Sequence, residues 1–235
     1  MEKKKMKLWK KIVLICLAVI VVLAAIIFVW QRNNIMAVVE TLSSSGDQIA
    51  QKLDDNKKAL EEDLKEEHPT IVRDFTAEEE KQIMKGELSV DDAVANLNRE
   101  YQSIREQYNI KSTGNSETDR QVDNLIGDKV IELYSLKAYY LGQLGQLESK
   151  VKSEYAAFPD SKKNMSGKKE LAGKYIGQAN SLLNQCDSRV SALLSELQSS
   201  LKSLGADTSI IKTIQSAYEN EKALKKAYYL KLLGQ

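Results

Sequence analysis

The sequence predicts an all-α protein: an N-terminal transmembrane helix, a helical stalk, and an antiparallel up-down-up helical bundle of three or four helices. Three observations support this fold class. Only two prolines occur in 235 residues, and Pro69 and Pro159 both fall between helical patterns rather than inside them. Apolar residues recur at steps of three and four, without the alternation typical of strands. An uncharged apolar run occupies residues 12–30.

That apolar run predicts a transmembrane signal-anchor. Its nineteen residues end at Trp30; as a helix they would span roughly 28 Å, close to the ~30 Å hydrocarbon thickness of a bilayer. Trp9 and Trp30 bracket the run at the membrane–water interface, where amphipathic rings prefer to lie. Six lysines precede the run and Arg32 alone closely follows it. We therefore expect residues 1–11 to form a basic cytoplasmic N-terminus, with the C-terminal domain outside the cell membrane.

A cleaved signal peptide is the alternative for the same segment. Residues 22–24 (Val-Leu-Ala) resemble a small-residue cleavage site, but the apolar run continues beyond them to Trp30. Signal peptides have apolar regions of about 7–15 residues, shorter than this one, so the length favours an anchor. Cys16 has no small residue beside it, and we interpret it as an apolar residue of the span rather than a lipidation site.

The charge and cysteine content of the remaining chain exclude several classes of protein. Beyond residue 11 there are 28 basic and 32 acidic residues, a net charge of −4, which argues against a nucleic-acid partner. Cys186 is the one cysteine outside the span, so no intramolecular disulfide framework can form there. A basic signal-anchor with so few cysteines is typical of a bacterial cell-envelope protein.

Two regions of different character precede the predicted bundle. Residues 31–67 are thin in apolar residues and rich in charge, which predicts a helical stalk or, as the alternative, a frayed tether. Residues 68–110 predict a short helix followed by an amphipathic one. Thr76 and Glu79 form a capping-box pattern, and Gly86 is placed to end the short helix.

The second helix of that region needs a partner surface. Val90, Val94, Leu97, Tyr101, Ile104 and Tyr108 step alternately by four and three, a coiled-coil-like seam. The partner would come either from the same chain, giving a four-helix arrangement, or from a second copy, giving a coiled-coil oligomer. Residues 111–118 have the composition of a linker. Residues 119–235 predict three helices, at about 119–158, 168–204 and 209–235, joined by short breaks that make neighbours antiparallel.

The sequence LKAYYLGQLGQ at residues 136–146 returns as KKAYYLKLLGQ at residues 225–235. Folding the three helices antiparallel places Tyr139 and Tyr140 opposite Asp187 and Cys186, with Tyr228 and Tyr229 near the same turn of the middle helix. We interpret this first as a packing layer, in which Ala138 and Ala227 let helices approach closely. The alternative is a binding platform. Six tyrosines are thus candidate partner or ligand contacts: Tyr101, Tyr108, Tyr139, Tyr140, Tyr228 and Tyr229.

No pattern in the chain predicts catalysis. The one histidine, His68, has no nucleophile motif beside it, and zinc sites require clusters of Cys and His that this chain lacks. The glycines of YLGQLGQ lie in a helical pattern without a preceding strand, unlike a phosphate-binding loop. Cys186 falls in an apolar seam, typical of an inert thiol, with a reactive thiol or intermolecular disulfide as the alternative. We expect that the protein is not an enzyme and binds neither a cofactor nor a metal.

We therefore expect a non-enzymatic membrane protein that binds the lipid bilayer through residues 12–30. Its outer helical domain would act as an envelope scaffold, spacer or accessory subunit, through helix–helix contacts with a protein partner or a second copy. The alternative is a ligand- or stress-sensing ectodomain. Because the predicted cytoplasmic end has only eleven residues, such a sensor would have to signal through another membrane protein.

Overall fold

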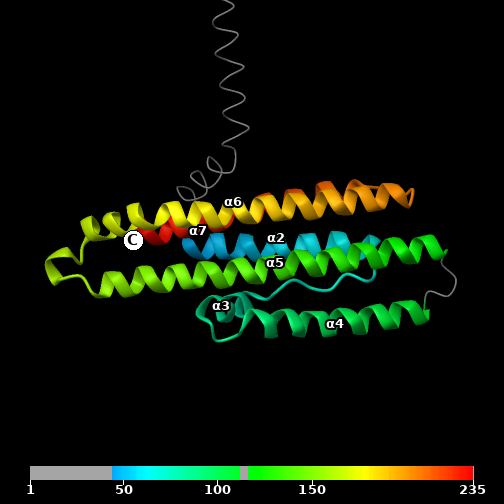
Figure 1. Cartoon of the computed structure of the whole chain (residues 1–235), viewed down its shortest axis with the longest axis horizontal. Helices are drawn as coiled ribbons and strands as arrows, with labels where there is room; N and C mark the ends of the chain where they lie inside the picture. The colour runs from blue at the N-terminus through cyan, green and yellow to red at the C-terminus, as the bar shows by residue number, and fades with distance from the viewer. Residues whose placement is uncertain (1–43, 112–115, 235) are drawn as a thin grey trace, which may run out of the picture. The chain divides into compact units, whose positions relative to one another are not determined.

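The computed structural model describes residues 44–111 and 116–234 (Figure 1). Within these residues the protein is all α, as predicted, and contains no strand. The helices are α2 (Gly46–Glu67), α3 (Ala77–Lys85), α4 (Val90–Lys111), α5 (Glu117–Ala156), α6 (Met165–Ser203) and α7 (Ser209–Gly234), with a 3-10 turn, η1, at Asp160–Lys162. The predicted cytoplasmic end, the transmembrane segment 12–30 and Trp9 and Trp30 lie outside the described residues. None of the described helices is both long and apolar enough to span a bilayer.

The chain divides into two compact units. The smaller unit contains the described residues up to Leu53 together with those from Tyr218 onward, and the larger contains Asp54–Ala217. In the smaller unit Ile49 and Ala227 are completely buried, with Leu53, Leu224 and Tyr228 packed around them. α2 begins there with a reciprocal cap, because the Ser45 backbone N–H donates to the Gln48 side chain (2.7 Å) and the Gln48 N–H donates to Ser45 Oγ (3.2 Å).

Helix α5 is the central element of the larger unit, packing against α3, α4 and α6. It runs antiparallel to α6: Lys174 of early α6 pairs with Glu154 of late α5 (2.7 Å), and Lys129 of early α5 pairs with Glu196 of late α6 (3.0 Å). Asn164 starts α6, its side-chain oxygen accepting from the backbone N–H groups at positions 166 and 167. The antiparallel pairing predicted for these two helices is confirmed.

The short helix α3 and the start of α4 form the helix–turn–helix that the sequence predicts. Thr76 and Glu79 make a complete capping box at the N-terminus of α3. Gly86 ends α3 with a left-handed backbone (φ 73°), a conformation that glycine adopts without steric cost. Ser89 Oγ then accepts from the Asp92 backbone N–H (3.0 Å) and starts α4. The local cap chemistry therefore determines where both helices begin and where α3 ends.

Two glycines of the LGQLGQ sequence allow this helix–turn–helix to pack closely against α5. A Cβ at Gly145 would lie 1.9 Å from the backbone oxygen of Met84 in α3, and a Cβ at Gly142 would lie 2.9 Å from Cγ2 of Val90 in α4. Glycine accepts this contact because it has no side chain. The glycines that the sequence could only assign to a helix thus mark a close helix crossing.

Helix α4 packs against another helix of the same chain, α5. Its residues Ala93, Leu97 and Tyr101 are at most 3 % exposed, and α4 packs along α5. Of the two alternatives for the seam from Val90 to Tyr108, the in-chain arrangement is the one observed. The expected boundary between residues 68–110 and the bundle from residue 119 is corrected accordingly, since α3 and α4 share the core of α5.

The described part of the predicted stalk also differs from expectation. Leu64 of α2 is 2 % exposed, and Asn56 donates from its side-chain nitrogen to the backbone oxygen of Ala217 (3.2 Å). Lys57 reaches Glu80 of α3. Residues 54–67 are therefore packed within the larger unit instead of standing free. The helix has few apolar positions, but buried ion pairs and hydrogen bonds supplement them.

We expect the cap of α3 to weaken in acid. The Arg73 guanidinium, hydrogen-bonded to Glu79 (2.7 and 2.9 Å), and the Thr76 backbone N–H lower the pKa of the Glu79 carboxyl to about 2. Because the folded pKa lies below the unfolded value, the stability from this carboxylate is present above about pH 4.5 and is lost as pH falls toward 2. Unfolding curves of the parent and Glu79→Gln at pH 7, 4 and 2.5 measure this. The difference in stability between the two should shrink steadily with acidity, and a constant difference would contradict it.

Candidate functional site

Four charged side chains of the larger unit form a largely buried network. Lys137 Nζ of α5 contacts Asp74 Oδ2 (2.6 Å) and Glu80 Oε1 (2.8 Å). Lys57 Nζ of α2 contacts the same Glu80 oxygen (2.5 Å) and donates to the backbone oxygen of Phe75 (3.2 Å). All four side chains are at most 13 % exposed. Two lysines and two carboxylates balance, so the network leaves no net buried charge.

This network joins α2, α3, α5 and the segment before α3. Phe75, which follows Asp74, is 2 % exposed and lies edge-on to Tyr134 of α5 (6.5 Å between ring centroids). A buried ion pair is costly to desolvate, and removing one partner leaves an uncompensated charge. The network therefore links four elements of the unit through the ion pairs of its charged groups.

The single histidine lies in a second cluster, at the other end of the same segment. His68 Nδ1 is 2.9 Å from Asp123 Oδ1 of α5, and the Tyr108 hydroxyl of α4 donates to Asp123 Oδ2. Thr70 Oγ1 donates to the backbone oxygen of Asp123 (2.7 Å). A carboxylate holding a histidine is an arrangement found in catalytic sites. Here, however, Asp123 accepts from α4 as well, and the cluster ties the ends of α2 and α4 to α5.

Tyr101, a predicted partner contact, is part of the core instead. It is 1 % exposed, and its hydroxyl donates to Asp128 Oδ1 (2.7 Å) and to the backbone oxygen of Asn124 (3.2 Å). Burial, together with the hydrogen bond to Asp128, raises the pKa of its phenol. Gly127 makes room for the ring, since a Cβ there would lie 2.7 Å from Tyr101 Cε2. Tyr101 and Tyr108 thus both serve the α4–α5 contact.

Tyr139 and Tyr140 of α5 face the part of α6 that the sequence predicts. The Arg189 guanidinium lies over the Tyr139 ring at 5.5 Å, and the Tyr139 ring, 41 % exposed, meets the Tyr140 ring edge-on at 5.1 Å. Cys186 is half-buried and close enough to affect Tyr140 electrostatically. The register expected from the antiparallel fold is confirmed. Burial raises the pKa of Tyr140, whose hydroxyl oxygen is buried without a hydrogen-bond partner among the described residues.

The second copy of the repeat belongs to the smaller unit. Tyr228 packs against its core of Ile49 and Ala227, whereas the Tyr229 side chain lies outside the described residues. Ala138 and Ala227, at equivalent positions of the two copies, are both completely buried, in agreement with the close-packing interpretation. That the two tyrosine pairs lie at one level stays a prediction.

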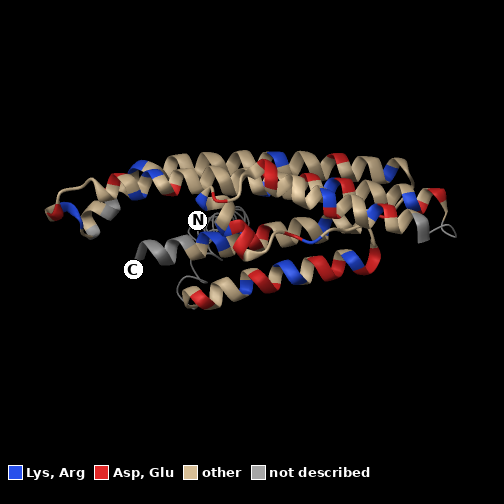
Figure 2. Cartoon of the chain, turned by 90° about the horizontal axis from the view of Figure 1, so that it is seen from below, with Lys and Arg blue, Asp and Glu red and all other residues tan. Residues whose placement is uncertain are grey.

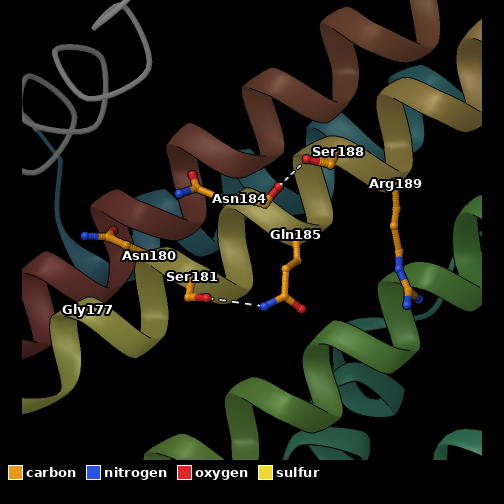
Figure 3. A pocket seen from close by; sticks show the side chains of 7 residues that line it. All are labelled: Gly177, Asn180, Ser181, Asn184, Gln185, Ser188 and Arg189. Carbon is orange, nitrogen blue, oxygen red and sulfur yellow. Dashed lines mark hydrogen bonds between the residues drawn. The ribbon is translucent and has the colours of Figure 1, made fainter.

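A shallow polar hollow lies on the outer surface of α6 (Figure 3). Ser181 Oγ accepts from Gln185 (3.2 Å), and the Ser188 hydroxyl donates to the backbone oxygen of Asn184 (2.9 Å). Arg189 extends toward α5, as Figure 3 shows. Arg189 is the one charged residue that lines the hollow. The full lining is Gly177, Asn180, Ser181, Asn184, Gln185, Ser188 and Arg189. Nowhere in the described chain do three or more His, Cys, Asp or Glu side chains gather in a way that could hold a metal ion.

Comparison with known proteins adds no relative: no family model, no curated protein and no solved structure matches this chain.

Sequence reasoning missed both buried polar clusters, although one signal was present. Asp123 and Lys137 fall in step with the apolar seam of α5 that includes Ile126, Val130 and Tyr134. A charged residue in such a seam indicates a buried partner. Their partners Asp74, Glu80 and His68 lie 55 to 63 residues earlier in the sequence, and no local pattern identifies them.

Proposed function

We propose that this chain is a non-enzymatic, single-pass membrane protein whose outer helical domain acts as an envelope scaffold, spacer or accessory subunit. Residues 12–30 would anchor it, with residues 1–11 in the cytoplasm and the bundle outside. The domain would work through helix–helix contacts with a protein partner or a second copy. The apolar run and its flanking lysines support the anchor, and the surface of α6 supports the mode of contact.

The observation that carries this proposal is the composition of the outer surface of α6. From residue 175 to 195 the helix contains two charged residues, Asp187 and Arg189, in a protein with 29 % charged residues. Exposed helical surfaces are normally rich in Lys, Glu and Arg. Here the exposed positions are instead mostly small or amide residues: Ile176, Gly177, Gln178, Asn180, Ser181, Asn184, Gln185, Ser188, Ser191, Ala192 and Ser195.

Two glycines of α6 strengthen this interpretation. Gly127, Gly142 and Gly145 of α5 each accommodate a close neighbour, but a Cβ at Gly173 or Gly177 would have nothing within 4 Å. Glycine inside a helix costs roughly 1 kcal/mol relative to alanine. Packing among the described residues does not offset that cost at these two positions. Close approach of a partner helix would.

Site-specific photocrosslinking in living cells tests the proposal. A photoreactive residue is placed at Ser181 or Ser188 on α6, and at Tyr139 beside it; Asn98 and Gln102, exposed on α4, serve as matched controls. We expect a discrete adduct, to one envelope protein or to a second copy, from the α6 positions and none from α4. Equal labelling from both helices, or adducts from neither, would remove the support for α6 as the contact surface.

One observation favours the sensing ectodomain as a second candidate. Tyr139 is 41 % exposed and lies beneath Arg189, and Arg189 lines the hollow on α6 together with Asn and Gln side chains. Aromatic rings flanked by amides suit a hydroxyl-rich ligand such as a sugar. Titrating the full-length protein in detergent with soluble cell-wall glycan fragments, followed by NMR of Asn and Gln side-chain amides, distinguishes this candidate. Saturable shifts at Asn184 and Gln185 that disappear in Tyr139→Ala would favour it over the scaffold.

A further inference from the structure

The end of the α5–α6 hairpin extends beyond its neighbours in the larger unit. Gly145 is where α3 crosses α5, and α4 runs from Gly142 in the opposite direction, toward Asp123. In Figure 1 the turn between α5 and α6 lies past α3 and α4. A separate small core holds this end together: Leu147, Leu171 and Tyr175 are buried, with Val151, Tyr155, Phe158, Ala179 and Leu182 around them.

This hairpin end is basic, whereas the N-terminal part of the larger unit is acidic. Residues 150–174 contain seven lysines and three acidic residues, a net charge of +4, while residues 54–92 contain fourteen acidic and six basic residues, a net charge of −8. Lysine colouring appears on both sides of the turn in Figure 2. The side chains described there are all exposed: Lys150, Lys152, Lys162, Lys163 and Lys174.

The tip between these lysines is apolar and exposed. Residues 155–159 read Tyr-Ala-Ala-Phe-Pro, and Ala156, Ala157 and Pro159 are all exposed. Lys162 lies over the Phe158 ring (5.7 Å) and Lys174 over the Tyr175 ring (5.2 Å). Ile176, which directly follows Tyr175 of this small core, is 60 % exposed, the most exposed large apolar residue described.

We infer that this end of the hairpin docks on an anionic phospholipid surface, an inference that rests on the membrane location proposed above. Lysines flanking small exposed apolar residues are an arrangement that binds a charged bilayer, because the lysine stems lie along the apolar surface while the ammonium groups meet phosphates. Four of these lysines pair with Glu148, Glu170, Asp160 or Glu154, but the pairs are exposed and weak, so phosphates can replace the carboxylates. An acidic protein would match the lysines but leave the exposed apolar tip without a role. The acidic segment 54–92 is repelled by the same surface, so the domain is oriented with the hairpin end toward it.

A depth measurement on the full-length protein tests the inference. Cys16 and Cys186 are replaced by serine, and Ser161, exposed in the turn, is replaced by a cysteine carrying an environment-sensitive fluorophore. The protein is incorporated into nanodiscs of phosphatidylcholine alone or with about 30 mol % phosphatidylglycerol, each containing lipids with a quencher near the head group. We expect quenching at Ser161→Cys to rise about threefold in the anionic discs and to return to baseline at high salt.

Matched variants separate the hairpin lysines from charge in general. One variant carries Lys→Gln at four hairpin positions, and its control carries the same change at four exposed lysines elsewhere: Lys150, Lys152, Lys162 and Lys163 against Lys58, Lys81, Lys202 and Lys212. The first should lose the response to phosphatidylglycerol and the second should keep most of it. A label at Asn98→Cys on α4 should respond to neither lipid.

The outcomes distinguish this inference from the function beneath it. A protein that enters nanodiscs but shows equal quenching in both lipids overturns the docking inference and leaves the anchor intact. Equal loss in both lysine variants, or an equal response at Asn98→Cys, also overturns it. A protein that does not enter nanodiscs contradicts the anchored function itself.

Discussion

Replacing Lys137 by alanine is expected to lower the free energy of unfolding by about 3–5 kcal/mol, the range observed when one partner of a buried ion pair is removed. Lys137 is 13 % exposed and bridges Asp74 and Glu80, whose side chains are 7 % and 12 % exposed. Without the ammonium group, Asp74 loses its lysine partner, although its Oδ1 still accepts from the Phe75 backbone N–H (2.7 Å). Glu80 keeps its ion pair with Lys57. We therefore expect the segment before α3 to separate from α5.

Chemical denaturation followed by circular dichroism measures this change. The matched control lies on the same helix: Lys152 pairs with Glu148 one turn away, but its side chain is 73 % exposed. Lys152→Ala should change stability by less than about 0.5 kcal/mol, since exposed ion pairs contribute little. In addition, Lys137→Met combined with Asp74→Asn should be less destabilised than Lys137→Met alone, because a neutral amide replaces the buried carboxylate that has lost its lysine. Similar small effects of Lys137→Ala and Lys152→Ala would show that the network contributes no more than surface pairs.

Gly145→Ala is expected to destabilise the protein by about 2–3 kcal/mol, although alanine favours helix over glycine by roughly 1 kcal/mol. The new Cβ would lie 1.9 Å from the carbonyl oxygen of Met84 and 2.6 Å from its carbonyl carbon. Both are backbone atoms, so no rotamer change relieves the overlap and α3 must move as a whole. Amide hydrogen exchange should therefore accelerate first in α3.

Gly177→Ala is expected to stabilise the protein, although it is the same type of substitution as Gly145→Ala. A Cβ at this α6 position meets nothing within 4 Å, so the substitution should stabilise the helix by about 0.5–1 kcal/mol. If Gly145→Ala also stabilised the protein, α3 would not be seated on α5 as described. Gly177→Ala bears on the proposed function as well, since a more stable protein with weaker crosslinking from Ser181 would indicate a partner helix at that surface.

The sequence predicts the local structure well because that structure depends on neighbouring residues. Each helix cap depends on residues at most four positions apart. This holds for the capping box of Thr76 and Glu79, the left-handed Gly86 and the start of α4 at Ser89. The antiparallel register of α5 and α6 also follows from local information. A short turn around Pro159 fixes it, and the contact of Arg189 with Tyr139 agrees with it.

The sequence predicts the role of the candidate site residues less well than it predicts the local structure. Tyr101 and Tyr108 look like contacts for a partner because six residues of their helix step by four and three, and that pattern does not say whose surface completes it. In the structure the surface is α5, and both hydroxyls meet its aspartates. Tyr139, at 41 %, is the most exposed of the described candidate tyrosines.

The sequence by itself determined the helical class, the helix ends and the apolar run at residues 12–30, since propensity, caps and hydropathy are properties of short segments. Only the tertiary structure decided which charged residues are buried. Lys137 falls in the apolar seam of α5, but its position does not identify Asp74 and Glu80 as its partners, and Lys57 resembles any other lysine of a polar helix. It also decided that residues 54–67 are packed rather than free, and that the glycines of LGQLGQ seat α3. Each of these depends on contacts between residues far apart in the chain, whose pairing no single segment encodes.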